Sequence, residues 1–155
     1  MEKSDKENNG CIRLTFLGHK SIPSRQGGIE IVVEELSTRM AALGYDVTCY
    51  NRRGHHVSGK EFDNTTENLK EYKNVKIKSV PTIEAKGLAA MSSSIFAAVA
   101  AAFGKYDVVH FHAEGPCAML WIPKLLGKRC IATVHGQIDI IALSGIYARN
   151  YGIFA

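Results

Sequence analysis

Three histidines are the side chains in this sequence best suited to chemistry. His110 and His112 lie in the stretch DVVHFH, and His135 ends the stretch CIATVH. In a strand, a spacing of two residues places both rings of the first pair on the same side. Because it ends its strand, His112 is expected to reach the rim of the sheet, where His135 could face the same crevice, and we favour a functional role for His112. For His110 we expect a hydrogen-bonded place in the core.

A pair of histidines with a third nearby also suggests a zinc site. The surrounding sequence offers no evident fourth ligand and no bridging carboxylates. We therefore expect no metal, and a metal-dependent hydrolase stays the weakest of three functional hypotheses. A serine hydrolase is not expected, because the nucleophile motif GxSxG is absent from the sequence.

A Gly-Gly pair, Gly27 and Gly28, directly precedes a stretch with helical periodicity. This helix lacks Ser, Thr, Asp or Asn at its start, so its first amides have no side-chain cap. Such amides favour binding of a phosphate or carboxylate; alternatively, the glycines serve to turn the chain. Neither GxGxxG nor a Gly-Lys-Ser/Thr motif occurs, so the loop is neither a dinucleotide fingerprint nor a P-loop.

Charged residues around this loop suggest a polar, anionic ligand. Glu30, in the first helical turn, is expected either to accept hydrogen bonds from sugar hydroxyls or to compensate the helix dipole. Basic residues in the neighbouring loops would attract an anion, although solvation alone also explains them. Because no stacking aromatic residues are interleaved with them, nucleic acid is not expected as a partner. These residues are Lys20, Arg25, Arg52, Arg53 and Lys86.

Alternating strands and helices are expected to position these residues. Strands are predicted over 11–18, 46–51, 75–80, 107–112 and 130–135, and helices over 29–43, 86–103 and 115–126. This order is typical of an α/β fold, a Rossmann-like open, mostly parallel sheet with helices on both faces. Ligands bind such sheets at the carboxyl ends of the strands. The alternating residues 75–80 predict an edge strand, after a surface excursion over 52–73.

Composition indicates one ordinary domain. The chain has 155 residues and a net charge of +4, and we expect residues 1–10 to form a disordered tail and 11–155 a single domain. The first ten residues cannot be a signal peptide, and the most apolar stretch, 88–103, is short for a membrane span. Four widely spaced cysteines are expected to be buried, reduced thiols. These features favour a cytoplasmic protein, with contact to the inner face of the plasma membrane left open.

Several ordered motifs resemble one enzyme family. The segments GHKSIPSRQGGIEIVVEELSTRMAALGYDVTCYNRR and YDVVHFHAEGPCAMLWIPKLLGKRCIATVHG resemble the start of glycosyltransferase family 4 enzymes, and more narrowly a bacterial rhamnosyltransferase-like branch. The resemblance covers about residues 12–136. Ser21 replaces a usual glycine, and the branch's Asp-Trp and Lys-Trp elements are missing after Gly136. The matching positions of the first loop are Gly18, Lys20, Ile22, Pro23, Ser24, Gly27, Gly28 and Glu30.

The resemblance implies a function as well as a fold. It implies the amino-terminal, acceptor-side half of a GT-B fold, with the donor-binding domain absent from this chain. The enzyme would move a sugar, with retention and without metal or cofactor, from a nucleotide-sugar donor to a glycan or lipid-linked acceptor in polysaccharide biosynthesis. By position, the resemblance makes His112 catalytic and gives Gly27 and Gly28 contact with donor phosphates or acceptor. From their places in the predicted loops, we expect Lys20 and Arg25 to join that contact. We expect acceptor binding by Glu30, His135, Gly136 and Lys86.

Three further expectations concern the chain on its own. We expect negligible transferase activity without a donor-binding domain, some self-association, and possible contact with a membrane. The alternative hypothesis is a truncated, catalytically inactive remnant that acts as a binding module.

Overall fold

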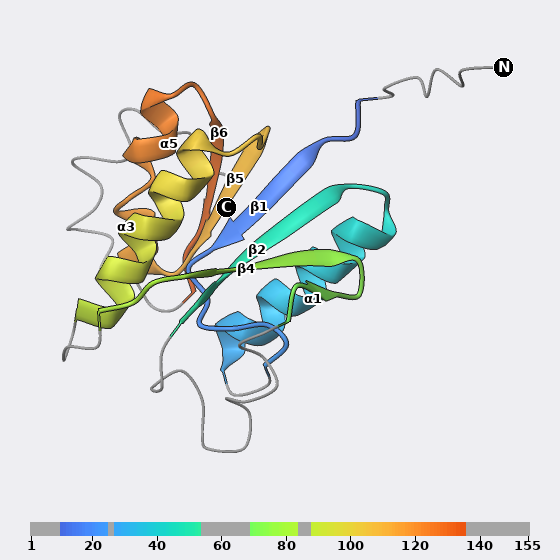
Figure 1. Ribbon diagram of the computed structural model, residues 1–155, viewed down its shortest axis with the longest axis horizontal. Helices are drawn as coiled ribbons and strands as arrows, with labels where there is room; N and C mark the ends of the chain where they lie inside the picture. Colours follow the sequence, from blue (N-terminus) through green and yellow to red (C-terminus); the bar gives the residue numbers. More distant parts are fainter. Residues whose placement is uncertain (1–9, 25–26, 54–68, 84–87, 136–155) are drawn as a thin grey trace, which may run out of the picture.

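The computed structural model describes residues 10–24, 27–53, 69–83 and 88–135, and its centre is a six-stranded sheet (Figure 1). The strand order is β3-β4-β2-β1-β5-β6, and every neighbouring pair is parallel except β3 with β4. The expected Rossmann-like α/β fold is confirmed. The strands are β1 (Arg13–Leu17), β2 (Asp46–Arg52), β3 (Glu71–Tyr72), β4 (Val75–Val80), β5 (Val108–His112) and β6 (Arg129–Thr133).

Helices cover both faces of the sheet, as expected (Figure 1). On one face α1 (Gly28–Ala42) packs against β2 and β4. On the other face α3 (Leu88–Phe103) contacts α4 (Glu114–Cys117) and α5 (Trp121–Leu125). Each face therefore has its own hydrophobic core.

Three element predictions were wrong. The stretch 52–73 was expected to be a surface excursion and 75–80 an edge strand, but Glu71–Tyr72 form β3, which pairs with β4 and takes the edge position. The helix expected over 115–126 is divided into α4 and α5. Pro123 has no N–H to donate to the carbonyl of Met119, so one helix over 115–126 would lose that bond, and Pro123 lies in the first turn of α5, where proline is tolerated. Instead the Ile122 amide donates to the Met119 carbonyl at 3.1 Å, in a tighter turn.

The buried face of α1 also differs from the expected apolar stripe. Helical periodicity places Val32 and Leu43 on the apolar side that was expected to face the core, but they are 41% and 74% exposed. Glu30 and Glu34 are instead buried, together with Val33. The helix is rotated relative to the expected orientation, because the carboxylates of Glu30 and Glu34 accept hydrogen bonds from the loop after β1.

Helix α3 has small buried residues and large exposed ones. Ser92, Ser93 and Ser94 are buried, and each donates its hydroxyl to a backbone carbonyl one turn earlier. The large apolar residues lie on the opposite, exposed face of this helix. Among the described residues no helix is both long and apolar enough to cross a bilayer.

The cysteines match their prediction in part. Cys49 and Cys117 are buried free thiols, and burial raises the pKa of Cys49 to about 12. Cys11, however, is exposed at the start of the described chain. The expectation that all four are buried was therefore wrong.

The ends of β1 and β5 make close backbone contact. Gly18 follows β1 with a φ of +105°, and an added Cβ would collide with the carbonyl oxygen of His112 at the end of β5. Gly44, after α1, has a similar φ of +92° but no described atom within 4 Å of an added Cβ. Both positions need a glycine conformation, but only Gly18 also has no room for a side chain.

Replacing these two glycines separates strain from collision. We expect Gly44→Ala to lower the free energy of unfolding by about 1–2 kcal/mol through backbone strain alone. Gly18→Ala should cost more than about 3 kcal/mol, because the loop must also move away from His112. Urea denaturation measures both values, and equal losses for the two variants would contradict the close contact.

Candidate functional site

The carboxyl ends of β1, β2, β5 and β6 meet at one edge of the sheet. The loop after β1 crosses this edge before it enters α1, and Gly18 lies against the backbone of His112. Asn51, near the end of β2, and His135, just after β6, belong to the same edge. We call this region the carboxyl edge. Six of the twelve buried polar side chains of the described chain lie here: His19, Ser21, Glu30, Glu34, Asn51 and His112.

Asn51 holds the loop after β1 in place. Its Oδ1 accepts the Ile22 amide at 3.1 Å and lies 3.1 Å from Nε2 of His19. Its Nδ2 donates to the Ile22 carbonyl at 2.9 Å and to the Ser21 hydroxyl at 3.3 Å. Asn51 is 3% exposed, so these bonds replace water for the amide and the loop. The loop is thereby fixed by a side chain of another strand.

Two carboxylates of α1, one helical turn apart, hold the same loop from the other side. Glu30 accepts the Lys20 amide at 3.1 Å, and Glu34 accepts the Ser24 amide at 3.3 Å. Glu34 also accepts the hydroxyl of Tyr72 from β3, at 2.9 Å. The carboxylates therefore bind protein backbone inside the fold. The structure thus gives Glu30 a use that the two sequence interpretations did not include.

The start of α1 agrees with the sequence prediction. Gly27 occupies the N-cap position in an extended conformation, and no described side chain caps the helix. A Cβ at Gly27 would collide with the carboxylate of Glu30, which explains a glycine there. Gly28 is exposed, with no described atom within 4 Å of an added Cβ. The first turn of α1 is therefore open to a ligand.

The histidines form a stacked cluster. Nδ1 of His112 lies 3.0 Å from Nε2 of His135, and the two rings are stacked with an interplanar angle of 15°. The ring centroids of His110 and His112 are 4.2 Å apart, and Nε2 of His110 lies 2.8 Å from the Thr133 hydroxyl. The expected core role of His110 is consistent with this bond to β6.

Burial keeps the imidazoles of His112, His110 and His19 neutral near pH 7. It lowers the pKa of His112 to about 3, with smaller contributions from His110, His19 and His135. Burial likewise lowers the pKa of His110 to about 4, and that of His19 to about 4 against an opposing effect of the Asn51 bond. Near neutral pH these rings carry hydrogen bonds rather than charge.

The expected exposure of His112 was wrong. It does end its strand, but its side chain is 0% exposed. Its ring lies against His135 and Phe16, while the loop at Gly18 covers its backbone. Nε2 of His112 is buried without a hydrogen-bond partner in the described part of the chain. His135 is only partly buried and is the imidazole nearer to solvent.

Backbone strain occurs next to this cluster. Ala113 follows His112 with φ 73° and ψ 155°, a combination that is adopted almost exclusively by glycine. Its amide donates to the Thr133 carbonyl at 3.2 Å, which links β5 to β6 beyond the last paired residues. Such strain costs about 1–3 kcal/mol and is concentrated at functional sites in proteins.

Several predicted site residues are not placed together by the structure. Lys20 is exposed in the loop that Glu30 holds. Arg25, Lys86 and Gly136 lie outside the described residues. No three His, Cys, Asp or Glu side chains within the described ranges are arranged to hold a metal ion.

Sequence reasoning missed three residues that build the edge: His19, Glu34 and Asn51. His19 and Asn51 follow or end apolar strands at positions where a polar residue is unusual, and that signal was available. Glu34 lies on a helix whose apolar stripe predicted it to be outside. Nothing in the sequence alone shows the Ser24 amide and the Tyr72 hydroxyl that retain it in the interior.

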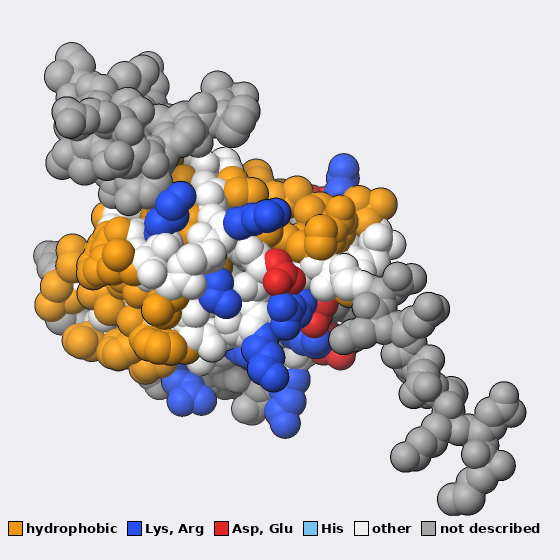
Figure 2. Space-filling model, turned by 90° about the horizontal axis from the view of Figure 1, so that it is seen from above, with side chains coloured by type: hydrophobic (Ala, Val, Ile, Leu, Met, Phe, Trp, Pro, Cys, Tyr) orange, Lys and Arg blue, Asp and Glu red, His pale blue; other side chains and the backbone are white. Residues whose placement is uncertain are grey.

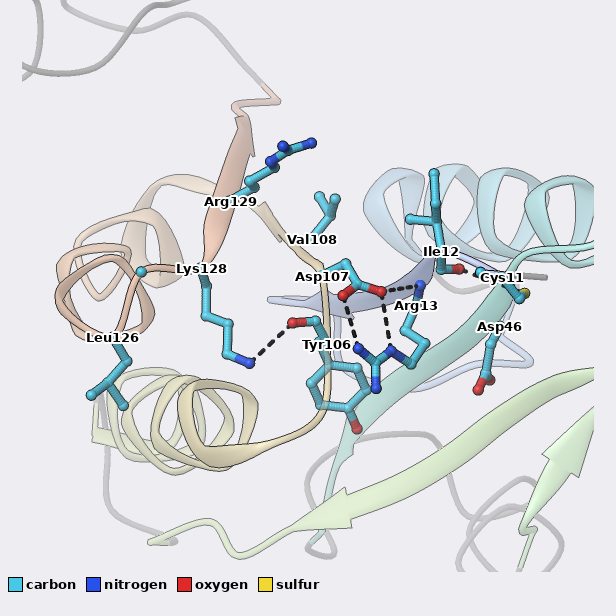
Figure 3. Close-up of a pocket in the computed structure, with 12 residues that line it drawn as sticks. Cys11, Ile12, Arg13, Asp46, Tyr106, Asp107, Val108, Leu126, Lys128 and Arg129 are labelled. Carbon is cyan, nitrogen blue, oxygen red and sulfur yellow. Dashed lines mark hydrogen bonds and ion pairs between the residues drawn. The ribbon is translucent and has the colours of Figure 1, made fainter. Parts of the chain in front are cut away.

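A pocket of about 890 Å³ lies at the opposite, amino edge of the sheet (Figure 3). The view from above shows Lys and Arg side chains grouped over this edge (Figure 2). Two of its cations have protein partners: Arg13 forms a paired contact with Asp107 at 2.9 and 3.0 Å, and Lys128 donates to the Tyr106 carbonyl at 3.0 Å. This pocket is therefore a structural region away from the histidine cluster.

Comparison with known proteins identifies one family. The family model described as Glycosyltransferase Family 4 matches residues 26–154, which is most of the chain. No curated protein matches the chain significantly.

The strain at Ala113 predicts a stabilising substitution. Ala113→Gly should raise the free energy of unfolding by about 1 kcal/mol, because glycine adopts the required conformation without a Cβ clash. Ala118→Gly is the matched control at an exposed position with helical φ and ψ, where glycine should cost about 0.5–1 kcal/mol. Thermal and urea denaturation measure both values. Destabilisation by Ala113→Gly would show that the backbone is not strained there.

The neutral histidines predict loss of stability in acid. Their lowered pKa values mean that the unfolded chain binds more protons than the folded chain below about pH 6.5. The contribution of the neutral histidines to the free energy of unfolding is fully present above that pH. It falls as the pH drops toward their pKa values in the folded chain. Each histidine contributes up to about 1.4 kcal/mol per pH unit. Urea midpoints at about pH 7 and pH 5 measure the slope.

His19→Gln provides the control for this slope. The glutamine amide can replace Nε2 in the bond to Asn51 but does not titrate. The acid slope should fall by about a third, one of three protons. An unchanged slope, or a wild-type midpoint that is the same at both pH values, would exclude the buried histidines as its source.

Proposed function

The chain belongs to glycosyltransferase family 4, and from this premise we propose that it forms the acceptor-side, amino-terminal half of a GT-B enzyme. The proposed reaction transfers a sugar, with retention and without a metal, from a nucleotide-sugar donor to a glycan or lipid-linked acceptor. One observation carries the proposal: the open first turn of α1 and the histidine pair share the carboxyl edge. His19 lies near both: burial lowers its pKa to about 4 despite the opposing charge of Glu30, and His19 adds a small contribution to the lowered pKa of His112.

The electrostatics of the edge fit a leaving diphosphate at α1. Glycosyl transfer develops negative charge on the leaving group, and preorganised amides at a helix start stabilise it. The neutral ring of His112 supplies no positive charge near pH 7. We therefore assign the diphosphate to the amides of Gly27 and Gly28, together with the exposed Lys20. Arg25 would add a second cation of the same loop.

The two histidines divide their roles according to exposure. A buried N–H without an acceptor is rarer in proteins than an unfilled lone pair. We infer that Nδ1–H of His112 donates to Nε2 of His135 and that the unpartnered Nε2 of His112 carries the lone pair. A neutral His135 then carries its own proton on Nδ1 and donates it to a sugar oxygen. In this proposal His135 contacts the sugar, and His112 fixes its tautomer and orientation.

The remaining assignments depend on the resemblance. Gly136 and Lys86, which lie outside the described residues, would contribute to acceptor binding. Four further parts of the proposal also rest on the resemblance. They are the bacterial rhamnosyltransferase-like branch, polysaccharide biosynthesis, a cytoplasmic location and contact with the inner membrane face. We also expect negligible transfer by this chain without a donor-binding domain.

One observation favours a second function, a binding module without catalysis. The side chain of His112 is sealed, and a sealed imidazole cannot touch a sugar. In a binding module the carboxyl edge would hold a nucleoside diphosphate or an acceptor through the α1 amides alone. The two functions differ in whether His135 responds to the sugar.

A titration followed by NMR tests the proposal. We expect a nucleoside diphosphate to shift the amide signals of Gly28 and Ile29 in the ¹⁵N-labelled chain. Gly28→Pro removes one donor while keeping the helix, because proline is tolerated at the first helical position and Gly27 is already extended. It should weaken binding about fivefold, the value of one hydrogen bond. Lys105→Ala, at an exposed position beyond the end of α3, should leave affinity unchanged.

The same titration separates the alternatives. A nucleotide sugar should shift the imidazole signals of His135 and His112 more than the nucleoside diphosphate does. Amide shifts without an imidazole response would support the binding module. Shifts confined to Arg13, Lys128 and Arg129 would place the ligand in the amino-edge pocket and contradict both functions.

A further inference from the structure

The exposed side of α3 is a continuous apolar surface, which we call the α3 face. The helix contains no charged residue in its 16 positions. Its large side chains recur every three or four residues, so they share one side of the helix. They are Leu88 at 50% exposure, Met91 at 53%, Ile95 at 37%, Phe96 at 41%, Val99 at 40% and Phe103 at 80%.

Helix α5 widens this surface. It packs beside α3, and Trp121 and Leu125 are 52% and 75% exposed. Figure 2 shows hydrophobic side chains gathered over the end of the molecule where Figure 1 places α3 and α5. Taking aromatic side chains at about 150–250 Å² and aliphatic ones somewhat smaller, these exposed fractions amount to roughly 800 Å². The largest apolar patch of a typical monomer is about 300–600 Å².

We propose that the α3 face binds a second copy of this chain, with the two α3 helices antiparallel about a two-fold axis between Ile95 and Phe96. An interface of standard size buries about 800 Å² on each partner. The α3 face and its α5 margin supply that area. A two-fold interface also requires that the surface complement itself, so that each contact occurs twice.

The order of side chains along α3 meets this requirement. An axis between Ile95 and Phe96 pairs these two residues across the centre and pairs Leu88 with Phe103 at both ends. It sets Met91 opposite Ala100, a large residue against a small one. Helices approach closely where large side chains face small ones.

The remaining pair is equally complementary. The axis places Val99 opposite Ser92, which is buried. The Ser92 hydroxyl accepts the Ile83 amide at 3.0 Å, which holds Ile83 beside the first turns of α3. Ile83 is 54% exposed and would cover Val99 of the second copy.

Charge distribution favours a second copy over a lipid surface. A helix that lies on an anionic membrane carries cations along its polar margin. Lys105 instead follows the carboxyl end of α3, where Lys128 donates to the carbonyls of Gly104 and Tyr106, and the helix itself carries no charge. In an antiparallel pair these groups lie about one helix length apart, roughly 24 Å. That distance exceeds the Debye length of about 8 Å, so their repulsion is screened.

Light scattering on the purified chain tests the assembly. Wild type should change from 17.0 kDa to twice that mass with increasing concentration. Phe96→Glu should stay at 17.0 kDa over the same range. Leu43→Glu, an equally apolar exposed position at the end of α1, should dimerise like wild type. A wild-type chain that stays monomeric, including one that binds vesicles of anionic phospholipid, would overturn the proposal.

Cysteine cross-linking tests the antiparallel geometry, in a Cys11→Ser background that removes the exposed thiol. A mixture of Leu88→Cys and Phe103→Cys chains should form a disulfide-linked dimer on mild oxidation. Neither variant alone should do so, because each position faces the other one in the second copy. Linkage of either variant to itself, or none in the mixture, would contradict the proposed pairing. This result does not depend on whether Phe96→Glu folds.

Discussion

The site depends on the backbone contact between Gly18 and His112, where β1 and β5 end. Parallel strands bring these ends side by side, and the loop after β1 must cross over the end of β5 to reach α1. With no space for a Cβ at Gly18, the loop is pressed onto His112. This contact covers the backbone of His112, whose imidazole is buried against Phe16 and His135, and the loop continues toward Asn51. The strained Ala113 and the bond from its amide to β6 continue the same close packing.

Polar groups that lose water in this packing must be paired, and the edge consists of such pairs. Asn51 and the carboxylates of Glu30 and Glu34 satisfy the loop from opposite sides. Nε2 of His112 and Nδ1 of His19 are exceptions, because neither has a partner among the described residues. The fold therefore leaves two open hydrogen-bonding positions at one edge, the first turn of α1 and the partly exposed His135. That combination suits a ligand with a diphosphate and hydroxyl groups, which is the basis of the proposed function.

The sequence predicted the mostly parallel α/β fold and much of the edge, because both follow from local patterns. Alternating apolar stretches place His112 and His135 at strand ends, and Gly27 and Gly28 mark an uncapped helix. The same patterns failed where distant groups decide the outcome. Glu34 is buried because Tyr72 and the Ser24 amide reach it, and the imidazole of His112 is buried because the rings of Phe16 and His135 lie against it. Pro123 was a local signal for the break between α4 and α5, and the helical pattern around it outweighed that signal.

The central claim is that the α1 amides and the histidine pair bind one ligand together. A crystal structure of the chain grown with a nucleotide sugar tests this most directly. The account predicts the diphosphate within hydrogen-bond distance of the Gly28 amide and a sugar oxygen at Nδ1 of His135. A ligand in the amino-edge pocket beside Arg13 and Lys128, with the carboxyl edge empty, would contradict it.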